Sequence, residues 1–128
     1  SRETDEAVMH AFMRELKGAD AVVLSDYAKG FFSEENAQCC IAACRKRDVP
    51  TIVDFKPCNK AFFRHAHVIA PNRSEAEALL PGFGDEKLRA QVELLYRMLD
   101  AERLVVTLGG DGLCGYDGRD FYQQAEIR

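Results

Sequence analysis

Short, uninterrupted apolar runs recur along the chain, each too short for a helix and rich in β-branched residues. Runs of this kind are typical of strands that are buried on both faces of a sheet. The predicted strands cover residues 21–24, 51–53, 68–70 and 104–107. After the last of them, Asp117 and Gly118 separate two short alternating segments, a pattern that predicts a terminal hairpin.

Between these runs the apolar residues recur every three or four positions, which is the spacing of amphipathic helices. The predicted helices cover residues 4–17, 33–47, 72–80 and 85–99. Apolar strands joined by helices imply the α/β class. We therefore predict one domain over residues 1–128, with a mostly parallel sheet flanked by helices on both faces.

Composition limits the partners that we expect. The chain has 17 Lys and Arg against 21 Asp and Glu, so its net charge of −4 supplies no field that attracts nucleic acid. No apolar run approaches the roughly 18 residues of a membrane span, and the N-terminal segment is unlike a signal peptide. We expect a soluble, cytoplasmic protein without a membrane partner.

The five cysteines follow no metal-type spacing, and their odd number fits poorly with a closed set of disulfides. We interpret them as reduced thiols. Cys40 and Cys44 lie one helical turn apart, a spacing that permits a shared metal ion, but no further ligand accompanies them. Packing as small buried hydrophobes is the favoured interpretation.

Polar residues or glycines follow every predicted strand. Asp26 follows the first, Asp54 the second and Asn72 the third, while a glycine-rich turn follows the fourth. In parallel sheets, ligands gather at the carboxyl ends of the strands. The pattern therefore predicts a binding site at this edge of the sheet.

The turn after the fourth strand contains Thr107, Gly109, Gly110 and Gly112. Glycines let backbone N–H groups approach an anion, and phosphate is the natural candidate. A tight turn into the terminal hairpin explains the same residues equally well. The segment is not a Walker A loop, because no Gly-Lys-Ser/Thr follows it.

Asn72 and Glu75 also have two interpretations. An N-cap Asn with a Glu three residues later forms a capping box, which by itself explains both residues. The functional interpretation is that Asn72 faces phosphate groups while Glu75 organises Mg²⁺ through the water shell that this ion retains. The two are compatible, since a capping geometry positions the same groups.

Acidic and basic residues are paired in the loops after the first two strands. Lys29 has the chemistry to neutralise a phosphate, and Asp26 the chemistry to orient sugar hydroxyls or a metal bound to nucleotide. A solvated ion pair in a glycine turn is the simpler interpretation, because such pairs are common and weak. The same alternatives hold for Asp54 and Lys56.

In order and spacing, these motifs resemble the ribokinase-like, or PfkB-type, carbohydrate kinases. The shared features are a strand ending in Ser-Asp-Tyr, a strand ending in an acidic loop, Asn-x-x-Glu, and Thr-x-Gly-x-x-Gly. Residues 24–30 and 53–57 look most like the kinase domain of bacterial heptose-7-phosphate kinases. The usual Asp-Pro-Lys of those proteins is here Asp54, Phe55 and Lys56.

The resemblance implies a ribokinase-like fold and phosphorylation of a sugar or sugar phosphate with ATP and Mg²⁺. It implies that Asn72 and Glu75 belong to the Mg²⁺ and phosphate motif, and that Thr107, Gly109 and Gly112 form part of the ATP site. The Asp-Thr-x-Gly-Ala-Gly-Asp segment, which carries the catalytic Asp of the family, does not occur in this sequence. We therefore interpret the chain as the central, nucleotide-side part of a kinase, and we expect it to be inactive alone.

A hypothesis from another class is a non-catalytic, flavodoxin-like regulatory or scaffold module, in which the acids at the strand ends serve structure. Such a module should bind no nucleotide and show no Mg²⁺ dependence. Because parts of the family fold are missing from the sequence, uncovered apolar surface should also favour a homo-oligomer.

Overall fold

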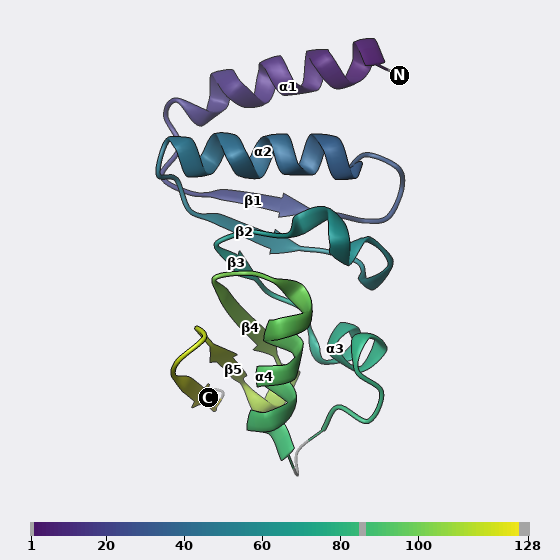
Figure 1. Cartoon of the computed structure of the whole chain (residues 1–128), viewed down its shortest axis with the longest axis vertical. Coiled ribbons are helices and arrows are strands. Elements are labelled where there is room, and N and C mark those ends of the chain that lie inside the picture. The colour runs from purple at the N-terminus through teal and green to yellow at the C-terminus, as the bar shows by residue number, and fades with distance from the viewer. Residues whose placement is uncertain (1, 85–86, 126–128) are drawn as a thin grey trace.

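A computed structural model describes residues 2–84 and 87–125, and they form one six-stranded sheet in the order β1 to β6 (Figure 1). The strands are β1 (Val22–Ser25), β2 (Thr51–Asp54), β3 (Val68–Ile69), β4 (Arg103–Thr107), β5 (Leu113–Tyr116) and β6 (Phe121–Gln124). Strands β1 to β4 pair in parallel, and β4, β5 and β6 pair antiparallel. The predicted α/β class, mostly parallel sheet and terminal hairpin are confirmed.

Over residues 2–84 and 88–125, one α-helix precedes the first strand, and three further α-helices and two 3₁₀ segments lie between strands. They are α1 (Arg2–Leu16), α2 (Glu34–Lys46), η1 (Pro57–Phe63), α3 (Arg73–Leu79), α4 (Leu88–Leu99) and η3 (Gly109–Asp111). The helices match the predicted ones, although the predicted start at Asp85 lies outside the described residues. The segment η1 has no helical spacing of apolar residues, and no element was predicted there.

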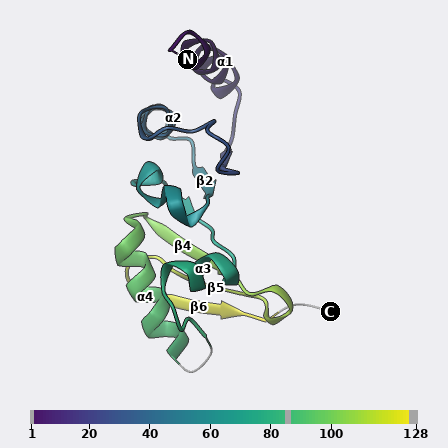
Figure 2. The same cartoon turned by 90° about the vertical axis from the view of Figure 1, so that its right-hand side faces the viewer.

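The core lies between the helices and one face of the sheet. Leu24, Val53, Ile69 and Leu104 point to this face and are buried against apolar residues of α2, η1, α3 and α4. Figure 2 shows α2 and α4 on the same side of the sheet. This differs from the expected cover on both faces. Parallel strands are joined by right-handed crossovers. Since β1 to β4 follow one another across the sheet in a single direction, every right-handed crossover places its helix on the same face.

The other face of the sheet carries apolar side chains that the described residues do not cover. Val23 is 61% exposed, and Ile52, Val68 and Val105 are only partly buried. Burial therefore alternates along the strands, although their sequences are apolar throughout.

Three cysteines are core residues. Cys40, Cys44 and Cys114 are buried, whereas Cys39 and Cys58 are exposed, and all five are free thiols. Burial, with Cys44 and Cys39 nearby, raises the pKa of the Cys40 thiol to about 12. Packing is the role that the structure gives to Cys40 and Cys44, and no group of three potential metal ligands occurs among residues 2–84 and 87–125. No described helix is long and apolar enough to cross a membrane.

Candidate functional site

The carboxyl ends of β1 to β4 are joined to one another along one edge of the sheet. The Asp26 backbone N–H donates to the Asp54 carbonyl at 2.8 Å, which links β1 to β2. The Thr107 N–H donates to the Pro71 carbonyl at 3.0 Å, and Asn72 forms an isolated parallel bridge with Thr107. The predicted convergence of polar residues on one edge is therefore present in the fold.

Asn72 and Glu75 form the predicted capping box at the start of α3. The Asn72 side-chain oxygen accepts the Glu75 backbone N–H at 2.8 Å, and Glu75 Oε1 accepts the Asn72 backbone N–H at 2.9 Å. Glu75 is only 8% exposed. The cap thus fixes a nearly buried carboxylate beside the end of β4.

Lys56 reaches Glu75 from the loop after β2. Its Nζ lies 3.8 Å from Glu75 Oε2. The neighbouring Phe55 is fully buried and packs against Phe63, with ring centroids 6.4 Å apart. Phe55, which replaces the proline of the usual Asp-Pro-Lys, is therefore a core residue. Lys56 lies at the edge of the sheet.

The glycine-rich turn after β4 places its glycines under different constraints. Gly112 has φ +88°, and a Cβ there would lie 1.9 Å from the Gln124 carbonyl oxygen. Gly109 has φ +61°, but a Cβ there would meet nothing within 4 Å. The fold itself therefore requires Gly112, whereas Gly109 borders open space.

That open space is a hollow of about 580 Å³. Among the residues that line it are Asn72, Thr107, Gly109 and Gly112. The structure thus brings together four residues that the sequence assigned to the nucleotide. Gly110 lies exposed in the same turn, and Glu75 sits behind Asn72 in the cap.

Arg73 and Asp111 form an ion pair that the sequence reasoning missed. Arg73 Nη2 lies 2.8 Å from Asp111 Oδ2, which fastens the start of α3 to the glycine turn. The Arg73 charge also acts on Cys114: burial raises the pKa of this thiol to about 11, and Arg73 partly opposes the increase. Arg73 and Asp111 are 38 positions apart, so no local pattern signals their contact.

Asp26 is bound within the fold, which is unlike the solvated pair with Lys29 that the sequence allowed. It is 4% exposed, and its Oδ1 accepts the Ala28 backbone N–H at 2.9 Å. Its Oδ2 accepts Asn59 Nδ2 of η1 at 2.6 Å. Lys29 and Asp54 are exposed. Asn59 is a further residue at this edge that sequence reasoning missed, because η1 was not predicted.

A family model described as pfkB family carbohydrate kinase matches residues 2–127. The chain belongs to the pfkB carbohydrate kinase family. Among its relatives is a bifunctional protein HldE of Sulfurimonas denitrificans, 30% identical over 119 residues that cover 91% of this chain and 25% of that protein. The HldE of Pseudomonas syringae pv. tomato is 40% identical over 99 residues, covering 77% of this chain and 20% of that protein. This pfkB chain thus spans a quarter or less of the length of these relatives.

Solved structures confirm the ribokinase-like fold. Arabidopsis thaliana ribokinase complexed with ribose and ATP matches with a TM-score of 0.68 and 20% identity, over 90% of this chain and 38% of that one. The tetrameric inhibited form of Escherichia coli phosphofructokinase-2 matches with a TM-score of 0.65 and 22% identity, over 90% and 40% of the two chains. At these identities the likeness concerns the fold alone.

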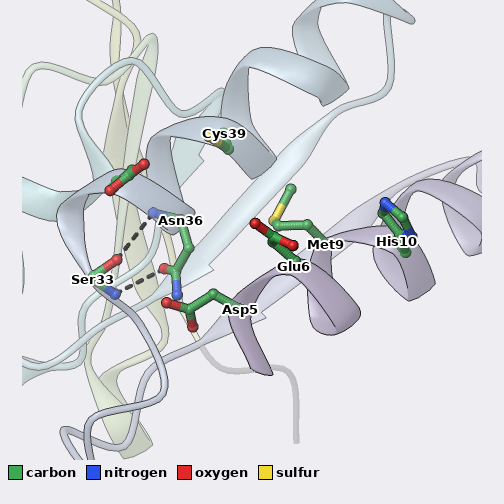
Figure 3. A pocket seen from close by; sticks show the side chains of 8 residues that line it. Asp5, Glu6, Met9, His10, Ser33, Asn36 and Cys39 are labelled. Carbon is green, nitrogen blue, oxygen red and sulfur yellow. Dashed lines mark hydrogen bonds between the residues drawn. The ribbon is translucent and has the colours of Figure 1, made fainter. Parts of the chain in front are cut away.

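The pfkB chain has a larger hollow, of about 850 Å³, between α1 and α2. Figure 3 shows Asp5, Glu6, Met9 and His10 of α1 facing the start of α2, where hydrogen bonds join Ser33 and Asn36. None of the residues that the sequence assigned to nucleotide or sugar lines it. The candidate site remains the one at the strand ends.

Proposed function

We propose that the pfkB-family kinase represented by this chain transfers the γ-phosphoryl group of ATP to a hydroxyl of a sugar or sugar phosphate. The chain supplies the nucleotide side of the site. The observation that carries this proposal is the hollow at the sheet edge, where Asn72, Thr107, Gly109 and Gly112 meet. Membership of the pfkB family supports the class of reaction.

The phosphate groups of the nucleotide would lie over the turn after β4. Gly109 presents no side chain there and borders open space, so its backbone is accessible to an anion. Gly112 and the Arg73–Asp111 pair both hold the C-terminal end of the turn in shape. Phosphoryl transfer depends mainly on positioning and on neutralising charge, and a turn held in one shape serves the positioning.

The residues around Glu75 fit Mg²⁺ as a cofactor. Glu75 Oε1 is used by the cap, whereas the contact of Oε2 within the described part of the chain is a long one, 3.8 Å from Lys56 Nζ. Mg²⁺ is commonly held by one or two carboxylates, its own waters and substrate phosphates, so one available carboxylate oxygen is a suitable donor. The ion would neutralise charge on the transferring phosphoryl group. The role of Glu75 is to hold it from a fixed position.

The acceptor would lie towards the ends of β1 and β2. Lys29 and Asp54 are exposed there and have the chemistry to contact a phosphate and hydroxyls. Asp26 acts by shaping the loop that carries Lys29, because both of its oxygens are bound within the fold. Lys56 stands between the acceptor side and Glu75. We assign no catalytic base among these residues, and we expect the 128 residues alone to show no turnover. A cytoplasmic location stays a prediction.

Nucleotide binding tests the proposal and separates it from the flavodoxin-like alternative. ATP is titrated by calorimetry into the wild-type chain and into Gly109→Ala. A methyl group there projects into the hollow, so binding should weaken at least about tenfold. Gly82→Ala is the matched control, since Gly82 also has a positive φ, +87°, with nothing within 4 Å, but does not line the hollow. Equal ATP affinity in all three proteins, or no binding to the wild type, would contradict the proposed site.

We also propose that the chain forms a homo-oligomer through its uncovered sheet face. Val23 is 61% exposed, with partly buried Ile52 and Val68 beside it, and apolar surface of this kind favours association. Light scattering should give the mass of a dimer or larger. A clean monomer, or association that persists in Val23→Lys, would contradict the role of this face.

A further inference from the structure

The Glu75 carboxylate divides its two oxygens between two partners. Oε1 accepts the Asn72 backbone N–H at 2.9 Å, and Oε2 lies 3.8 Å from Lys56 Nζ. The first contact completes the helix cap. The second comes from a different strand end and adds nothing to capping. It therefore needs an explanation of its own.

The two members of this ion pair differ in their freedom to move. The Glu75 side chain is 10% exposed and is tied by the cap, whereas the Lys56 side chain is 46% exposed. The Lys56 backbone is fixed by its neighbours, since Phe55 is buried in the core and Pro57 begins η1. Consequently the ammonium group can swing into solvent about a fixed backbone, but the carboxylate cannot.

A counter-charge close by stabilises a carboxylate that is nearly buried. In the structure, Lys56 supplies it. A divalent cation at Oε2 would supply the same compensation more strongly, and it would repel an ammonium group at the same oxygen. We propose that Lys56 is an internal competitor for the metal at Glu75, compensating the carboxylate until a divalent cation binds and then moving away. This rests on the proposed function, which assigns Mg²⁺ to Glu75.

The proposal gives Lys56 a part in coupling the two sides of the site. When the ammonium leaves Glu75, it stays on the loop after β2, two residues from the exposed Asp54. The Lys56 charge is then available on the acceptor side, in addition to that of Lys29, only after the metal is bound. Because coupling between two sites is reciprocal, an anionic acceptor that attracts Lys56 would in turn strengthen metal binding.

Titration of Mn²⁺, followed by loss of the free-ion electron paramagnetic resonance signal, tests the competition without any turnover. The wild-type chain is compared with Lys56→Met, Lys56→Arg and Glu75→Gln. Removing one close positive charge should tighten Mn²⁺ binding about fivefold or more. Lys56→Arg, which keeps the charge, should bind Mn²⁺ as the wild type does. Glu75→Gln should lose the site.

Lys60→Met is the matched control for net charge, because Lys60 is exposed in the neighbouring η1. The melting temperature gives a second readout. Lys56→Met leaves Glu75 without its counter-charge, so its melting temperature should be lower than that of the wild type. Mn²⁺ should raise the melting temperature of Lys56→Met by more than it raises that of the wild type. This larger increase also separates loss of the ion pair from general misfolding.

The outcomes distinguish the inference from the proposed function. Binding that needs Glu75 but is equal in wild type, Lys56→Met and Lys60→Met would overturn the competition alone. The competition is likewise overturned if Lys60→Met tightens Mn²⁺ binding as much as Lys56→Met does. Absence of any Glu75-dependent Mn²⁺ binding up to millimolar concentrations would remove the metal role of Glu75, and the competition would fall with it.

Discussion

At the β3–β4 half of the sheet edge, the residues assigned to nucleotide are held by the fold itself. Asn72 and Glu75 cap α3, Gly112 lies against the β6 backbone, and Arg73 is paired with Asp111. At the β1–β2 half, the fold holds only part of the set. Asp26 is bound to Asn59 and Ala28, while Lys29 and Asp54 extend into solvent.

This difference fits the phosphate role that we propose for the β3–β4 half and the acceptor role that we propose for the β1–β2 half. A phosphate site works through fixed N–H groups and charges, so its residues gain from being parts of caps and turns. An acceptor site has to recognise a particular sugar, and exposed side chains on a loop are suited to that task. The Lys56–Glu75 ion pair joins the two halves. Substitutions in the β3–β4 half and in the β1–β2 half are therefore expected to differ in how much they change turnover and how much they change folding stability.

The largest effect is expected at Glu75, measured in the kinase that we propose. Glu75→Gln removes the charge that we propose for Mg²⁺, a contribution of several kcal/mol to transition-state stabilisation, so turnover should fall by orders of magnitude. Asn72→Ala should lower turnover as well, yet cost only about 0.5 to 2 kcal/mol of folding stability, the usual value of an N-cap.

Turnover is measured with saturating sugar and ATP across a Mg²⁺ series, alongside thermal melts. Ser33→Ala is the matched control, because it removes the equivalent cap of α2 outside the site. It should lower the melting temperature about as much as Asn72→Ala and leave turnover unchanged. Near-normal turnover in Glu75→Gln, with only a lower melting temperature, would reduce Asn72 and Glu75 to a helix cap.

The next largest effect is on stability, at Gly112. Gly112→Ala places a methyl group against the Gln124 carbonyl at a backbone φ of +88°, so unfolding by urea should show a loss of about 2 kcal/mol or more. Gly30 has a similar φ, +84°, in the β1–β2 half, but its Cβ would meet nothing within 4 Å. Gly30→Ala should cost only the backbone strain. Equal losses would show that the hairpin does not constrain the turn.

A smaller loss is expected at Asn59. Asn59→Ala leaves Asp26 Oδ2, in a nearly buried carboxylate, without its side-chain donor, which should lower the free energy of unfolding by about 1 to 3 kcal/mol. Lys60→Ala, at the next and exposed position, should change it by less than about 0.5 kcal/mol. If the two variants unfold alike in urea, the Asp26–Asn59 bond does not hold the β1–β2 half.

The sequence predicts the elements of the fold correctly where the contacts that form them lie between residues close together in the chain. Strand positions follow from short apolar runs, and the Asn72–Glu75 cap from a spacing of three residues. Contacts between distant segments gave no signal: Asp26 and Asn59 are 33 positions apart, and Arg73 and Asp111 are 38 apart. The sequence also did not predict that the helices cover one face of the sheet. The side on which they lie depends on the order of the strands, and the apolar content of the strands does not encode that order.

The roles predicted for the residues of the candidate site stay predictions, and the structure shows which contacts these residues make within the fold. Asp26 was assigned to substrate for its carboxylate, and the structure uses both of its oxygens within the fold. Phe55 stood out as a departure from a family motif, and its burial against Phe63 explains it. A charged or unusual residue at a strand end can serve either packing or a ligand, and only its neighbours in space decide which.

The smallest expected effect is a change in the free energy of unfolding caused by one substitution in the loop after β1. Its sign is the informative part. Ala28 has φ +58°, a left-handed conformation that costs an L-residue about 1 to 2 kcal/mol. Ala28→Gly relieves this strain but gives the unfolded chain more freedom, which opposes it by about 0.4 to 1 kcal/mol. The net result should be a gain of up to about 1.6 kcal/mol in the free energy of unfolding by urea. The same change at Ala42, exposed in α2, should instead cost about 1 kcal/mol. Opposite signs would show that the backbone at Ala28, whose N–H donates to the Asp26 carboxylate, is strained. A loss at both positions would mean that the loop after β1 is unstrained at Ala28.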